Sequence, residues 1–205
     1  MFNPLKDHTS IVLTDLRIKK SFDPGRNYID PYLIAIVTDK KDGVLRMSSK
    51  RFDFPNVKVY ERIITSDSTF SLYGPGNPGE FVTTTLMLME SDSDIRIVGQ
   101  QLDDLISGTA EEVGAVAALS GNPSAIAITA LAQKILQGVA KVLQQNKDDQ
   151  ICFVYDTWFQ GELPPYGINQ YKIHSSSVAD VTLRVSPLLV GGQQGWMTFA
   201  QAEVK

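Results

Sequence analysis

The chain has 205 residues, of which 43% are hydrophobic and 20% are charged, and its formal net charge at pH 7 is −4. These proportions are typical of a soluble globular protein and argue against a disordered or collagen-like chain. The acidic balance, without a dense run of Lys and Arg, argues against a nucleic-acid-binding protein. The single cysteine, Cys152, excludes an intramolecular disulfide.

The termini and the apolar segments bear on where the protein resides. The first ten residues lack the apolar stretch and the small-residue cleavage site of a signal peptide. The most apolar segment, 115–142, is interrupted by Asn122-Pro123 and contains lysine and glutamine side chains, so it predicts no membrane span. We therefore expect a cytoplasmic protein without a transmembrane segment, with leaderless export as an alternative.

Strand patterns dominate the first half of the chain. The β-branched run at 11–18 leads into a loop rich in Asp, Pro and Gly, and the near-continuous apolar run at 32–38 is typical of a strand buried in a sandwich. Asp42-Gly43 is a strong turn pair, so 44–49 is expected to return as the second strand of a hairpin. Further strands are predicted at 57–64, 70–73, 81–89 and 95–102.

The pattern changes from strand to helix after residue 102. Thr109-x-x-Glu112 is a capping box, and Asn122-Pro123 can cap and begin a second helix, which predicts a helical hairpin at about 103–146. Strand patterns return at 151–159, 181–186 and 196–199, the last two within an extended C-terminal segment, 160–205. We therefore expect one mainly β domain over 1–205, an antiparallel β-sandwich with an inserted helical hairpin.

An acidic loop follows the first predicted strand. Asp23 and Asp30 flank a turn made by Pro24 and Gly25, and Pro31 fixes the backbone at the start of the next strand. A calcium ion prefers six to eight oxygen ligands from a loop that can bend around it. These aspartates therefore predict part of a calcium site, although turn geometry alone is an alternative explanation for both.

A second acidic group follows the strand at 81–89. Glu90, Asp92 and Asp94 occupy alternate positions, which point to the same side of an extended chain. Three carboxylates on one side repel one another, and a bound dication would relieve that repulsion. A solvated strand end is the alternative explanation.

The two acidic groups together resemble the C2 domain family. The resemblance rests on Asp23-Pro24-Gly25 and Asp30-Pro31-Tyr32 in the first loop, and on Asp92-x-Asp94 with Val98-Gly99 after the later strand. It covers roughly residues 11–103, with 151–159 as a candidate last strand. The helical hairpin and the segment after residue 160 have no obvious counterpart in that family.

The resemblance implies a function as well as a fold. Asp23 and Asp30 would be first-loop calcium ligands, and Asp92 with Asp94, or alternatively Glu90 with Asp92, would be second-loop ligands. It also implies calcium-linked docking to an anionic lipid surface or to a protein partner. The alternative function is a calcium-independent structural or assembly subunit, which uses the helical hairpin and the C-terminal segment for protein contacts, including contacts in a homo-oligomer.

Enzymatic patterns are weak in this sequence. Cys152, His174 and Asp156 could be combined as a nucleophile set, but Cys152 lies in an apolar strand pattern, which is typical of an inert thiol. The two histidines and one cysteine give no zinc-site spacing. We therefore expect a protein that is not an enzyme, with no catalytic residues and with Ca²⁺ as its one expected cofactor.

Overall fold

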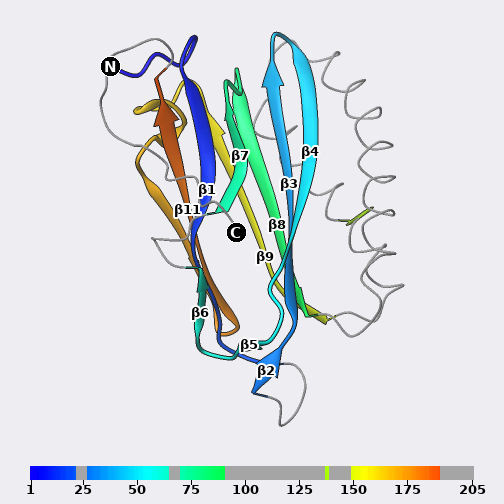
Figure 1. Ribbon diagram of the computed structural model, residues 1–205. Coiled ribbons are helices and arrows are strands. Elements are labelled where there is room, and N and C mark those ends of the chain that lie inside the picture. The colour runs from blue at the N-terminus through cyan, green and yellow to red at the C-terminus, as the bar shows by residue number, and fades with distance from the viewer. Residues whose placement is uncertain (22–26, 65–69, 91–136, 139–148, 190–205) are drawn as a thin grey trace, which may run out of the picture.

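The computed structural model describes residues 1–21, 27–64, 70–90, 137–138 and 149–189 (Figure 1). Strands dominate this part of the chain, and the one short 3-10 helix in it is η1 (Pro165–Gly167). The strands, in chain order, are β1 (His8–Ile18), β2 (Tyr28–Ile29), β3 (Pro31–Lys41), β4 (Val44–Asp53), β5 (Val57–Lys58), β6 (Arg62–Ile64), β7 (Phe70–Gly76), β8 (Phe81–Glu90), β9 (Asp149–Phe159), β10 (Tyr171–Ser175) and β11 (Ala179–Leu188).

Two antiparallel sheets form a β-sandwich-like fold (Figure 1). One sheet has the order β10-β11-β1-β6, with β7 also paired to β1, and the other has the order β4-β3-β8-β9. A small two-stranded sheet, β2-β5, lies at one end of the sandwich. The antiparallel order follows from the short connections, because a tight turn such as Asp42-Gly43 can only join antiparallel neighbours.

The core lies between the two main sheets. Period-two alternation places every second side chain of a strand on the inner face, and these inner residues form one apolar cluster. That cluster includes Ile11, Leu13 and Leu16 from β1, Leu33, Ala35 and Val37 from β3, Val82, Leu86 and Leu88 from β8, and Val181, Leu183 and Val185 from β11.

The apolar run predicted as a sandwich-interior strand is confirmed. All residues of β8, and all of β3 except Lys41, are buried. Both faces of these central strands are therefore removed from water, which explains why their sequences are apolar almost without interruption. Strands predicted at 11–18, 44–49, 70–73, 81–89, 151–159 and 181–186 also coincide with observed strands.

The prediction of an inserted helical hairpin at about 103–146 is wrong for the fold that the structure defines. Apart from Gln137 and Gly138, which are helical, the elements of the described residues are strands and η1, so the fold that they define is mainly β with antiparallel sheets. Of the predicted hairpin, only Gln137 and Gly138 are described, and two residues make no hairpin. The capping box and the helical periodicity are local signals for a helix, and such signals do not determine the fold on their own, because tertiary context overrides helix propensity. The strands predicted at 95–102 and 196–199 lie outside the described residues.

The single strand predicted at 57–64 is also corrected. The segment forms two short strands in different sheets, β5 beside β2 and β6 beside β1. Tyr60, between them, has a φ of 74°, a left-handed conformation that interrupts a strand. Its N–H donates to the Ile18 carbonyl at 2.8 Å, and its carbonyl accepts from Arg17 Nε at 2.9 Å, so both sides of the bend are held.

Candidate functional site

The start of β3 and the end of β8 lie at one end of the sandwich, and each of them is next to or contains one residue of a predicted acidic group, Asp30 and Glu90. The antiparallel register pairs Pro31 with Glu90, so Asp30 precedes a residue that lies directly beside Glu90. Asp23, Asp92 and Asp94 lie outside the described residues. The structure therefore places two of the five predicted ligands, Asp30 and Glu90, and both are at the same end.

The environments of Asp30 and Glu90 differ. Asp30 is exposed, and its Oδ1 accepts a hydrogen bond from the Asn56 N–H at 2.7 Å. That bond holds the tight turn at Asn56, whose φ is 58°. Glu90 is the last residue of β8 and is only 4% exposed. Asp30 thus has a structural role in the turn and still presents carboxylate oxygen to solvent.

A third carboxylate at this end was missed by the sequence reasoning. The β3–β4 register pairs Asp53 with Tyr32, next to Pro31. Its Oδ1 accepts a hydrogen bond from Arg51 Nε at 2.8 Å, and the Arg51 guanidinium lies 4.1 Å from the centre of the Tyr32 ring. Equal steps outward from the Asp42-Gly43 turn would have predicted this pairing, because a tight hairpin fixes the register of both strands.

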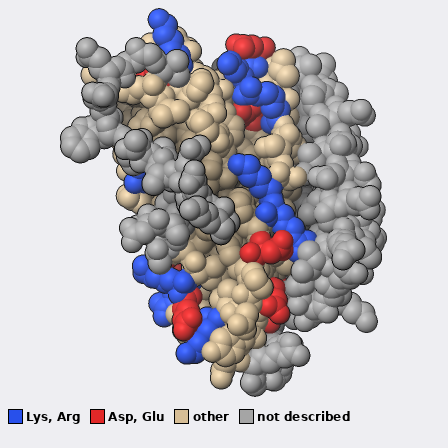
Figure 2. Space-filling model, viewed as in Figure 1, with Lys and Arg blue, Asp and Glu red and all other residues tan. Residues whose placement is uncertain are grey.

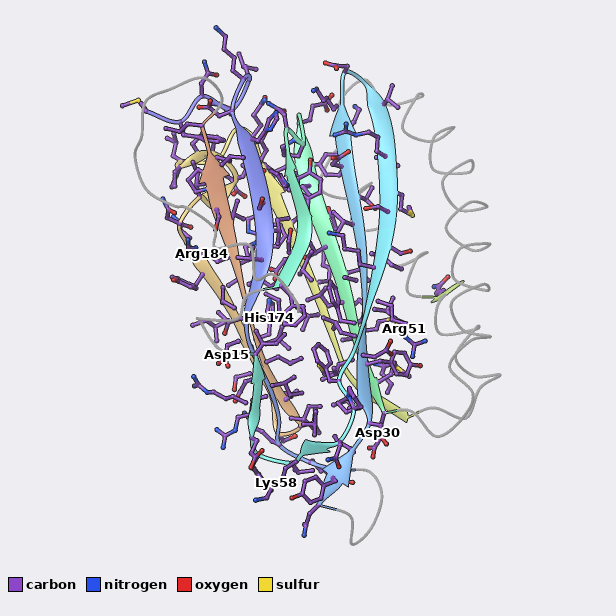
Figure 3. All side chains as sticks on the ribbon, viewed as in Figure 1. Asp15, Asp30, Arg51, Lys58, His174 and Arg184 are labelled. Carbon is purple, nitrogen blue, oxygen red and sulfur yellow. The ribbon has the colours of Figure 1, made fainter. Side chains whose placement is uncertain are left out.

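The described carboxylates at this end do not form a complete metal-binding site. Among the described residues, no group of three or more His, Cys, Asp or Glu side chains is close enough together to hold a metal ion. Figure 3 shows Asp30 and Lys58 at the same end of the molecule. Figure 2 shows that Lys and Arg side chains lie beside Asp and Glu side chains at this end of the visible face. Ion pairs there include Lys58–Glu61 and Arg62–Asp15, both at 3.6 Å.

The residues considered for a nucleophile set lie on the other side of the fold from β4. His174 Nε2 is 2.5 Å from Asp156 Oδ2, and Lys172 Nζ is 3.3 Å from Asp156 Oδ1. Cys152 and His174 line the same cavity. Burial raises the pKa of Cys152 to about 11, so its sulfur is a protonated thiol at neutral pH and a poor nucleophile.

The opposite end of the sandwich contains a buried polar network that the sequence did not predict. Asp39 accepts two hydrogen bonds from Arg46, each at 2.6 Å, and a third from the Tyr73 hydroxyl at 2.8 Å. Burial and the bond to Asp39 raise the pKa of Tyr73. The network joins β3 and β4 of one sheet to β7 of the other, so its role is to hold the two sheets together.

Comparison with known proteins adds no family to this picture. No family model matches the chain, and no curated protein matches it. Among the described residues, no helix is both long and apolar enough to cross a membrane. The class that the structure defines is therefore a β-sandwich-like domain with carboxylates at one end.

Proposed function

We propose that the chain is a non-enzymatic, C2-like binding module that takes Ca²⁺ at its acidic end. The observation that supports this proposal is the β3–β8 register, which sets Glu90 beside Pro31, the residue that follows Asp30. Asp53, which pairs with Tyr32 on the other side of β3 from Glu90, is a further carboxylate at this end. Oxygen ligands from several segments at one end of a rigid sheet suit a hard cation such as Ca²⁺.

The same end carries side chains that suit a docking surface. Tyr28 is 53% exposed and Tyr60 is 64% exposed, and the β2–β5 register pairs Tyr28 with Lys58. Ile29, in contrast, is only 3% exposed and belongs to the core, so it is not a membrane-inserting residue in this conformation. Tyrosine combines an apolar ring with a polar hydroxyl, as a lipid or protein interface requires. Bound Ca²⁺ would reduce the negative charge of this end and let it approach an anionic lipid surface or a protein partner.

The thermal stability of the protein tests calcium binding. A ligand that binds only the folded state at one hundred times its dissociation constant stabilises that state by about 2.7 kcal/mol. For a chain of this size, that corresponds to a rise in Tm of about 5–10 °C. Asp30→Asn should reduce the rise. Asp42→Asn is the matched control, because Asp42 lies in the β3–β4 turn at the opposite end and has a φ of 53°, which Asn tolerates.

The alternative function, a calcium-independent structural or assembly subunit, has one observation in its favour. Asp30 and Asp53 already have partners, Asn56 and Arg51, so these two carboxylates are satisfied without a metal ion. Light scattering distinguishes the two functions. A defined oligomer in the presence of a calcium chelator, with no change in Tm on adding millimolar Ca²⁺ to the folded protein, would favour the structural subunit and contradict the calcium module.

A further inference from the structure

A cavity opens on the side of the sandwich where each main sheet has an edge strand, β9 in one sheet and β10 in the other. Its volume is about 380 Å³, within the range of sites for small organic molecules. Its walls come from β9, β10 and β11 and include Cys152, Val154, His174, Ala179 and Val181. The lining thus combines two titratable side chains, Cys152 and His174, with apolar ones such as Val154, Ala179 and Val181.

One carboxylate beside the cavity contacts two nitrogen-bearing side chains. The Asp156 carboxylate, whose side chain is 10% exposed, faces both His174 and Lys172. One negative group is thus shared by two groups that can carry positive charge. A carboxylate near the imidazole would add a second hydrogen-bond partner for the ring, and hydrogen bonds between ionised groups are stronger than those between neutral ones.

The other polar side chains of the wall already have partners. The Ser175 hydroxyl donates to Asp180 at 2.5 Å, and the Ser176 hydroxyl accepts from the Ala179 N–H at 3.1 Å. His174 uses Nε2 to contact Asp156, and within the described residues its Nδ1 has no hydrogen-bond partner. The imidazole is therefore the group at this wall that can meet a polar ligand.

We propose that this cavity binds a small organic acid, with its carboxylate beside His174 and its apolar part against Val154, Ala179 and Val181. Asp156 holds the imidazole through Nε2, and Lys172 pairs with the other oxygen of the Asp156 carboxylate. The cavity shares no described residue with the acidic end, and Figure 3 shows His174 well separated from Asp30. The two sites can therefore be tested separately.

The chain has two histidines, which makes the test direct. The imidazole signals of His8 and His174 are followed by NMR while phenylacetate is added, with 2-phenylethanol as a probe of nearly the same shape without the carboxylate. We expect the His174 signal to shift to a plateau with a dissociation constant on the order of millimolar. We expect no shift for His8, and at least tenfold weaker binding of the alcohol.

A second readout uses the single cysteine. Because Cys152 lines the cavity, saturating phenylacetate should slow its alkylation by iodoacetamide, measured by mass spectrometry at a constant pH. His174→Gln should remove this protection, whereas His8→Gln should keep it. Equal binding of the alcohol would overturn the assignment to organic acids. An unmoved His174 signal with an unprotected Cys152, or parallel shifts of both histidines that never saturate, would overturn the site itself.

Discussion

The Asp39–Arg46–Tyr73 network should contribute strongly to stability, and replacing Asp39 with Ala tests this. Asp39 has a side chain that is 5% exposed and accepts three hydrogen bonds of 2.6, 2.6 and 2.8 Å. Hydrogen bonds to a charged group contribute about 1.5–3 kcal/mol each. The Arg46 side chain is 48% exposed and regains water when its partner is lost, which reduces the net cost. We expect a loss of about 3 kcal/mol in the free energy of unfolding.

Urea denaturation of Asp39→Ala measures this loss, and Asp53→Ala is the matched control. Asp53 is also bonded to an arginine of β4, Arg51, but its side chain is 55% exposed. Exposed ion pairs of this kind contribute about 0–1 kcal/mol. The double variant Asp39→Ala/Arg46→Ala should lose less than the sum of the two single variants, because the residues interact directly. Equal losses for Asp39→Ala and Asp53→Ala, or additive losses in the double variant, would refute the reasoning.

Three further predictions concern other parts of the fold. Tyr60→Val should lower the free energy of unfolding by more than about 1 kcal/mol although the side chain is exposed, because a β-branched residue is strained at a φ of 74°. The control Tyr171→Val, within β10, should lower it by less than about 0.5 kcal/mol, and equal losses in urea denaturation would contradict the prediction. Cys152 should react with iodoacetamide at pH 8 roughly a hundred times more slowly in the folded protein than in the protein unfolded in urea, because burial raises its pKa from 9.0 to about 11. A similar rate in both states would show that the folded protein has an accessible thiolate. The hydrogen bond from Lys19 lowers the pKa of Asp180 below 3.8, so the stabilisation that this bond provides is present above pH 3.8 and is lost as the pH falls through the lowered pKa. The difference in the free energy of unfolding between the native chain and Asp180→Asn should therefore shrink in acid. A difference that stays constant with pH would contradict the prediction.

Much of the sheet architecture could be predicted because its signals are local. The Asp42-Gly43 turn and the apolar runs on either side of it specify the β3–β4 hairpin and the burial of β3. The division of 57–64 could not be predicted, because it depends on two contacts with residues distant in sequence: the Tyr60 N–H donates to the Ile18 carbonyl, and Arg17 Nε donates to the Tyr60 carbonyl. β10 was missed because it is a short edge strand without a buried apolar face: Tyr171 and Ile173 are exposed, and no residue of Tyr171–Ser175 is buried.

The sequence predicted only part of the candidate site. Acidic residues at strand ends are visible in the sequence, and the β3–β8 register then joins two of those ends. Asp53 was missed because its position depends on the register of a hairpin that was predicted to end at residue 49, whereas β4 continues to Asp53. The sequence did not establish the contact between Asp156 and His174, because this contact requires β9 and β10 to lie as edge strands on the same side of the fold.

The central claim is that the acidic end binds Ca²⁺, and a crystal structure of the protein grown in millimolar CaCl₂ tests it most directly. The claim predicts one ion with carboxylate oxygens from the Asp23–Asp30 loop and from the 90–94 segment at about 2.3–2.6 Å. An end without an ion, in which Asp30 keeps its bond to Asn56 and no carboxylate of the 90–94 segment shares a ligand with it, would contradict it.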